Sequence, residues 1–187
     1  MKQFMKVAVV PALALIFLAA CGNGKVKKES NTADSISSNQ PATTEQGTAV
    51  APGVQLKDDK LNAVYEHYAL LTAALVKGNA KEARLASNAI ATGAKEISGG
   101  ESIGLNASKI TATADLEAQR VAYAALSNDF ISLAKKTGVN NGQLYVDFCP
   151  MAMNDKGAYW ISGDKSIQNP YFGEKMMTCG EVKETIQ

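Results

Sequence analysis

Apolar residues recur at three- and four-residue steps along several stretches of this chain, which predicts amphipathic helices. The first stripe runs from Leu61 to Leu75, and Gly78 closes it. A second stripe follows Asn79, whose spacing from Glu82 is that of a helix-capping box. It continues to about residue 97, where two consecutive glycines end it. These two stripes predict consecutive helices joined by a very short connection.

A third long stripe extends from Leu116 to Leu133 and ends in a basic pair followed by Gly138, a typical helix terminus. The stretch between residues 101 and 113 leaves room for a further short helix. Because short connections favour antiparallel neighbours, the pattern predicts a mainly α fold built on a small up-down bundle of three long helices.

The pattern changes in the C-terminal quarter of the chain. Residues 144–149, with the sequence LYVDFC, have strand composition, and residues 158–161 can return as a partner strand after the turn signal NDKG. Asn169 and Pro170 then combine a favoured N-cap with proline at the first helical position. Gly180 stands where such a helix would stop. We therefore expect a short β-hairpin followed by a short C-terminal helix at 170–179.

The first 20 residues have a basic start, a short apolar run and small residues at the end, which is typical of an export signal. Residues 18–21, LAAC, resemble the lipobox of bacterial lipoproteins, in which the cysteine is acylated. We therefore expect a signal peptide at 1–20 and a lipid anchor on Cys21. Gly22 is not the aspartate of an inner-membrane retention signal, which favours the outer membrane, with the protein facing the periplasm of the cell envelope.

Residues 22–57 are rich in Ser, Thr, Asn, Gln, Gly and Pro and contain few bulky apolar side chains. A segment of this composition buries too little apolar surface to fold by itself. We expect residues 21–57 to form the lipidated cysteine and a flexible tether of roughly 30 Å, as random-coil scaling gives. Residues 58–187 are then a single helical domain with a C-terminal lobe rich in cysteine and methionine.

Charge excludes some classes of function. Without its leader the chain carries 17 basic residues, two fewer than the 19 of the full sequence, against 18 acidic ones. A near-neutral protein with no basic cluster in its body is not expected to bind nucleic acid.

No serine or cysteine beside a positioned histidine, no paired-carboxylate motif and no phosphate-binding glycine loop is recognisable, so we do not expect an enzyme.

The C-terminal lobe holds two of the three cysteines and four of the six methionines. Cys149 and Met151 lie two apart in an extended segment, while Met176 and Cys179 lie three apart on the expected helix, so each pair shares a face. Thiolate and thioether sulfurs are soft donors that suit Cu(I). If the two segments meet, these four residues form a soft-metal site.

The residues also permit other interpretations. An exported chain with two cysteines in its body can pair them, and a Cys149–Cys179 disulfide would stabilise the fold by about 3 to 4 kcal/mol. In that case the protein would be a disulfide-stapled interaction module without metal. A reactive dithiol is the third alternative. Met153, Met177 and His67, the only histidine, are further candidate metal ligands.

Several motifs resemble the DUF3347 family, a domain of unknown function in exported bacterial proteins. They are CPMAMNDKGAYWIS and NPYFGEKMMTCG in the tail, and YEHYALLTAALVKGNAKEA and AQRVAYAALS in the helical part. The likeness spans about residues 57–184. Members are similar to modules appended to copper/silver efflux adaptors of the CusB type. The resemblance implies copper handling in the periplasm, partnership with such an efflux system, and Cys149, Met151, Met176 and Cys179 as the metal ligands.

Overall fold

The computed structural model describes residues 53–187. The leader, Cys21 and all but the last few residues of the expected tether lie outside the described residues. Two residues of the expected tether, Val54 and Leu56, are already buried in the described part of the chain. The described elements are β1 (Gln55–Leu56), α1 (Asp59–Val76), α2 (Ala80–Gly93), η1 (Ala94–Glu96), α3 (Glu101–Thr111), α4 (Leu116–Thr137), β2 (Val139–Asn141), β3 (Leu144–Cys149), α5 (Ala152–Asp155), β4 (Ala158–Ser162), η2 (Gly173–Lys175) and β5 (Glu181–Ile186).

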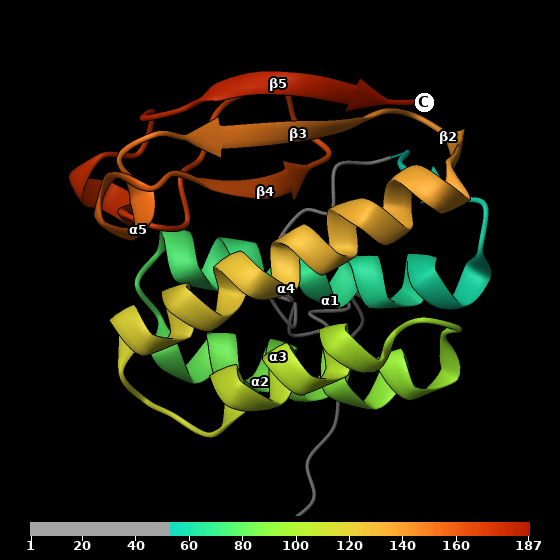
Figure 1. The fold of residues 1–187 in the computed structure, drawn as a ribbon, viewed down its shortest axis with the longest axis horizontal. Coiled ribbons are helices and arrows are strands. Elements are labelled where there is room, and N and C mark those ends of the chain that lie inside the picture. Colours follow the sequence, from blue (N-terminus) through green and yellow to red (C-terminus); the bar gives the residue numbers. More distant parts are fainter. Residues whose placement is uncertain (1–52) are drawn as a thin grey trace, which may run out of the picture. The chain divides into compact units, whose positions relative to one another are not determined.

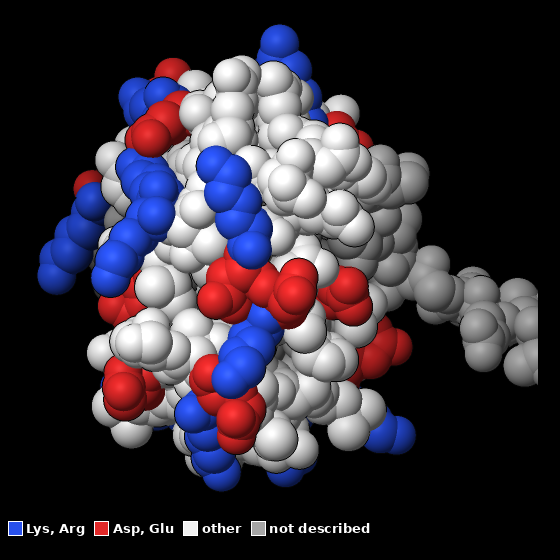
Figure 2. Space-filling model, turned by 90° about the vertical axis from the view of Figure 1, so that its right-hand side faces the viewer, with Lys and Arg blue, Asp and Glu red and all other residues white. Residues whose placement is uncertain are grey.

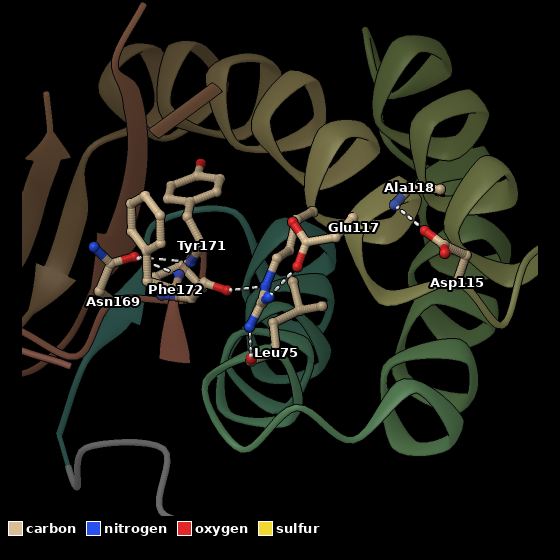
Figure 3. Close-up of polar contacts among 9 residues, drawn as sticks. Leu75, Asp115, Glu117, Ala118, Asn169, Tyr171 and Phe172 are labelled. Carbon is tan, nitrogen blue, oxygen red and sulfur yellow. Dashed lines mark hydrogen bonds and ion pairs between the residues drawn. The ribbon is translucent and has the colours of Figure 1, made fainter. Parts of the chain in front are cut away.

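Short polar side chains start three of the four long helices. Asp58 accepts a hydrogen bond from the amide of Leu61 at the start of α1, and Asn79 accepts one from Glu82 at the start of α2, as its spacing predicts. Asp115 does the same for Ala118 of α4 at 2.7 Å (Figure 3). Each cap pairs an amide that the first helical turn leaves without a partner.

The helices and one sheet form layers (Figure 1). A three-stranded sheet of β3, β4 and β5 covers α4 and α1, and α2 and α3 lie on the other side of those two helices. Apolar faces fill the space between the layers. The largest fully buried side chains include Tyr65, Tyr68, Tyr123, Phe130 and Trp160.

The sheet order is β4-β3-β5 and both pairings are antiparallel. The central strand β3 is therefore bonded on both sides, and β4 and β5 are its edges. A second, two-stranded sheet joins β1 to β2. The edge strand β5 exposes four of its six residues, Glu181, Lys183, Glu184 and Thr185, and buries only Ile186.

A buried hydroxyl cluster joins the helices to the sheet. The Tyr68 hydroxyl lies 2.8 Å from the Ser127 hydroxyl and 2.9 Å from that of Tyr123, which also bonds Thr72. The same Tyr68 oxygen accepts a 3.1 Å hydrogen bond from the backbone amide of Ile161 on the outer edge of β4. Burial raises the pKa of Tyr68 to about 12. Tyr68 therefore stays neutral and pairs a strand-edge amide that would otherwise be left alone.

The expected bundle of three long helices is wrong, because α3 makes a fourth. It begins directly after the glycine pair that ends the second stripe, and it buries Ile103, Asn106, Ala107 and Ile110. Its periodic signal is weaker than that of the longer stripes on either side, because only four of its 11 residues are buried and one of these four, Asn106, is polar.

The expected C-terminal helix at 170–179 is also wrong, and a third strand follows it. Only the short turn η2 forms there, since Gly173 has φ +58° and Met176 lies outside the helical region at φ −149° and ψ 57°. The expected hairpin of 144–149 with 158–161 is present as β3 and β4. It belongs to a larger sheet because β5 pairs with the free side of β3.

The surface carries charges of both signs. On the face shown in Figure 2, basic and acidic side chains are interspersed, without a large field of one sign. Within residues 53–187 no helix combines the length and the apolar character needed to cross a membrane.

Candidate dithiol site

Cys149 is the last residue of β3 and is completely buried. It lies opposite Ala158 of β4 in the antiparallel register. Because β3 is the central strand, the backbone that carries this thiol is bonded on both sides along most of its length. Cys149 is therefore held on the most constrained element of the sheet.

Cys179 lies at the end of a long loop, just before β5. Its amide donates to the carbonyl of Met176 at 3.1 Å, and its carbonyl accepts a 2.6 Å hydrogen bond from the side-chain amide of Asn169. Gly180, with φ +145°, follows it. A Cβ at that position would come within 2.9 Å of the Trp160 ring and 3.0 Å of the Phe148 carbonyl oxygen. Only glycine therefore fits at this position without strain.

Asn169 organises the loop that carries Cys179. It is completely buried, and its Oδ1 accepts from the amides of Tyr171 at 2.8 Å and Phe172 at 3.3 Å (Figure 3). Its side-chain amide donates to the carbonyl of Cys179, and its backbone amide donates to the carbonyl of Met177. One side chain thus bonds both ends of the loop, which fixes where Cys179 begins its approach to the sheet.

Arg120 of α4 attaches the same loop to the helices. Its guanidinium is 5% exposed and donates to the carbonyls of Pro170 at 2.9 Å and Leu75 at 3.2 Å, while Glu117 accepts at 2.6 Å (Figure 3). A buried cation of this kind is tolerated because its donors are paired. Arg120 therefore connects α1, α4 and the loop that holds Cys179.

These supports bring the two cysteine sulfurs to 3.2 Å from each other. A disulfide is about 2.05 Å long, so the sulfurs would need to approach by about 1.2 Å to form one. Two thiolates on a tetrahedral metal with bonds of about 2.3 Å are about 3.8 Å apart, which requires an opening of about 0.6 Å. The hydrogen bond with Cys149, together with partial burial and the charge on Cys149, raises the pKa of Cys179. The pair can therefore close to a disulfide or open around an ion with small movements.

The methionines predicted as ligands occupy the segments on either side of this pair. Met151 immediately precedes α5 and is 46% exposed. Met153, within α5, is half-buried against the core, while Met176 and Met177 follow η2 and are half-buried. Direct contact within the predicted set is made by Cys149 and Cys179. Among residues 53–187 no group of three or more His, Cys, Asp or Glu side chains is arranged to hold a metal ion.

His67 lies in a different part of the molecule. It lines a shallow groove of about 390 Å³ between α1 and α2, together with Lys60, Val64 and Glu96. No residue of the sheet or of the Cys179 loop lines that groove. The structure thus places His67 in a setting separate from the two thiols.

A buried carboxyl group on β3 was not predicted. Asp147 is completely buried, and neither of its carboxylate oxygens has a hydrogen-bond partner. Burial, with a smaller contribution from Asp164, raises its pKa to about 7. Alternation along the strand puts Asp147 on the same side of β3 as Cys149. The available signal was a single carboxylate within the otherwise uncharged strand LYVDFC.

The connection that follows Cys149 has an unusual backbone. Met153, Asn154 and Asp155 all have positive φ, between 55° and 61°. A left-handed conformation costs an ordinary residue about 1 to 2 kcal/mol, and asparagine and aspartate tolerate it best. The turn next to Cys149 is therefore strained. Its NDKG sequence predicts a turn but not this left-handed backbone.

Comparison with known proteins gives one family. Residues 64–142 match the model described as protein of unknown function (DUF3347). No match was found among curated proteins or among solved structures. The family match runs from α1 to β2, which supports the predicted family over the helical part of the chain. The lobe that contains β3, β4, β5 and both thiols lies outside the matched residues.

Proposed function

Since residues 64–142 match the DUF3347 family model, and the lobe beyond them holds two thiols 3.2 Å apart, we propose that this is a lipid-anchored envelope protein that binds Cu(I). Cys149 and Cys179 supply the two principal ligands. The observation that carries the proposal is the thiol pair itself, which comes from segments 30 residues apart in sequence. Copper is the cargo of the protein in this proposal, and no catalysis is involved.

The donor set suits a soft monovalent ion. Thiolates bind Cu(I) in preference to the harder divalent cations, which need oxygen ligands. Only two thiols are in contact here, fewer than the three or four protein ligands of a zinc site. Met151 and Met176, close in sequence to the two cysteines, are the proposed additional donors. Binding requires both thiols to lose their protons, so affinity falls as the pH is lowered.

A second candidate function is favoured by the burial of Cys149. A completely buried thiol 3.2 Å from its partner is also what a reduced structural disulfide looks like. Oxidation would close a loop of 31 residues and stabilise the lobe by about 3 to 4 kcal/mol. The protein would then be a disulfide-stapled module that binds a partner without metal.

Competition for Cu(I) separates the two candidates. The full chain carrying Cys21→Ser, which retains only the two lobe thiols, is reduced and titrated against a chromogenic Cu(I) chelator. We expect one Cu(I) per chain, and loss of at least about tenfold in affinity in Cys149→Ser and in Cys179→Ser, since each removes one of two thiolate ligands. Met151→Leu and Met176→Leu test the two proposed thioether donors, and Met153→Leu and Met177→Leu test the two further candidates. Failure of the reduced protein to compete would reject copper binding.

Mass spectrometry of the protein isolated from the cell envelope tests the second candidate. A disulfide that forms quantitatively and resists mild reductant would support the structural staple. Thiols that are recovered free, or protected by bound Cu(I), would contradict it. The same two Ser variants then separate the roles. If the cysteines form a structural disulfide, each variant is thermally less stable than the oxidised wild type. If they are only metal ligands, each variant is nearly as stable as the metal-free reduced wild type.

Anchoring and partnership are part of the same proposal. Lipidation of Cys21 would hold the domain at the outer membrane, where the tether lets it reach a copper/silver efflux adaptor. We expect Cys21→Ser to move the protein from the membrane to the soluble envelope fraction, and an inhibitor of lipoprotein signal peptidase to block processing. Equal membrane association of the variant and the wild type would exclude the lipid anchor.

A further inference from the structure

The two thiols of the site differ in their access to solvent. Cys149 is completely buried and belongs to the hydrophobic core, whereas Cys179 is partly exposed and only packs against it. The two sulfurs nevertheless touch at 3.2 Å. A molecule arriving from outside therefore meets Cys179 more readily than the buried Cys149.

We propose that this pair carries out thiol–disulfide exchange with a fixed direction, in which Cys179 reacts with an external disulfide and Cys149 resolves the product. In the first step the Cys179 thiolate attacks one sulfur of the external disulfide. A Cys179–S bond forms to that sulfur, and the other sulfur leaves as a thiolate. In the second step the Cys149 thiolate attacks the Cys179 sulfur and displaces the remaining half of the reagent.

The electrons balance between the two dithiol/disulfide couples. The protein dithiol loses two electrons and two protons and becomes the Cys149–Cys179 disulfide, while the external disulfide is reduced to two thiols. The second step needs the two protein sulfurs to approach by about 1.2 Å, from 3.2 Å to bonding distance. Since the backbone of Cys179 is held through Asn169 and Met176, the movement is made by rotation of the Cys179 side chain.

The two cysteines lie on different kinds of element. Cys149 lies at the end of the central strand β3, whereas Cys179 lies between the turn after η2 and the start of β5. Cys179 and its neighbour Met177 are half-buried, and Thr178 between them is exposed. The accessible sulfur is therefore also the one that can turn towards either a reagent or Cys149.

This inference does not depend on copper binding, because it uses only the proximity and unequal burial of the thiols. If both hold, oxidation removes the two ligands, and the redox state of the pair decides whether Cu(I) can bind. The exchange is measured at about pH 8.5, near the ordinary pKa of a thiol, because the thiolate is the attacking species.

The test uses glutathione disulfide as the external reagent and the full chain carrying Cys21→Ser. We expect Cys149→Ser to accumulate a stable glutathione adduct on Cys179, because the resolving thiol is missing. Cys179→Ser should form its adduct at least about tenfold more slowly, since its remaining thiol is buried. The protein with both thiols should release two glutathiones and end as the internal disulfide. Equal adduct rates in the two variants, or faster reaction of Cys149, would overturn the inference.

Two further measurements keep the result independent of damage to the fold. In concentrated guanidinium chloride the two Ser variants should react at rates within about threefold of each other, because unfolding exposes both thiols alike. A folded-state ratio equal to this denatured ratio would contradict the assignment. In the protein with both thiols, a limiting amount of iodoacetamide should modify Cys179 before Cys149, as located by peptide mapping. The opposite order would also overturn it, whatever the copper titration shows.

Discussion

The side-chain amide of Asn169 donates a 2.6 Å hydrogen bond to the carbonyl oxygen of Cys179, ten residues further along the chain. Because Asn169 also receives the amides of Tyr171 and Phe172, Asn169→Ala removes three hydrogen bonds in a buried loop. We expect a loss of at least about 3 kcal/mol in the free energy of unfolding, since each of the three groups left unpaired costs about 1 to 3 kcal/mol. Chemical denaturation measures this loss.

Asn79→Ala is the matched control, because Asn79 caps α2 through one exposed hydrogen bond. Its replacement should cost only about 0.5 to 2 kcal/mol, and it should not alter the reactivity of either thiol. In Asn169→Ala, by contrast, the loop loosens and iodoacetamide should reach Cys149 faster. An unchanged rate at Cys149 would show that Asn169 does not hold the thiol pair together.

Arg120 should be the side chain that holds the loop to the helices. Arg120→Met leaves the carbonyls of Leu75 and Pro170 without their donor, and we expect a loss of about 2 to 4 kcal/mol in unfolding free energy. Arg84→Met removes a similar bond, from the Arg84 guanidinium to the Thr111 carbonyl, on an exposed surface. That control should cost less than about 1 kcal/mol. Similar losses in the two variants would refute the importance of burial at Arg120.

Tyr68 links the helices to the edge of β4 through a single oxygen. Tyr68→Phe leaves the Ile161 amide without a partner and breaks the contacts with Ser127 and Tyr123. We expect a loss of about 1 to 3 kcal/mol, with hydrogen exchange at the Ile161 amide rising more than at the other amides of β4. Tyr145→Phe, which removes one exposed hydroxyl contact to Gln143, should change the stability by less than about 0.5 kcal/mol.

The carboxyl of Asp147 should make stability depend on pH. Its pKa is about 7 in the folded protein and about 3.9 in an unfolded chain. Between these values the folded state binds the extra proton, so stability is greatest below about pH 4, falls as the pH rises towards 7, and is level above that. The slope is at most about 1.4 kcal/mol per pH unit.

Asp147→Asn removes the titrating group. As the pH rises from about 4 to 7, the stability of the variant should therefore increase relative to that of the wild type. Asp164→Asn keeps Asp147 but removes the neighbouring charge that helps to raise its pKa. This control should retain the slope and shift it to slightly lower pH. A difference that stays constant from pH 4 to 8 would mean that Asp147 is ionised throughout.

Helix positions were accessible from the sequence where a long stripe agreed with an end signal, as with Gly78 after α1, Asn79 before α2 and Gly138 after α4. The prediction of a helix at 170–179 was wrong because Asn169 followed by Pro170 favours a tight turn as well as the start of a helix. In the structure Asn169 uses its cap-like bonds to Tyr171 and Phe172 to close a loop instead. The strand β5 gave no signal because Ile186 is its only fully buried residue, and an alternating pattern needs several.

The candidate site, like the fold, was predictable from the sequence only in part. Composition singled out Cys149 and Cys179, but their separation depends on contacts that no local pattern encodes, namely Arg120 to Pro170 and Asn169 to Cys179. Asp147 was overlooked because a carboxylate in a strand is ordinarily assigned to the solvent side. Its burial depends on tertiary packing, which the sequence of the strand itself does not encode.

The outer strand β5 ends the sheet with a row of alternating charges, Glu181, Lys183 and Glu184, in which Lys183 pairs with Glu181. An uncharged ribbon in this position would offer its unpaired backbone groups to the same strand of a neighbouring molecule. Copies of the protein at high concentration would then be prone to join edge to edge. The charges on this strand discourage such polymerisation.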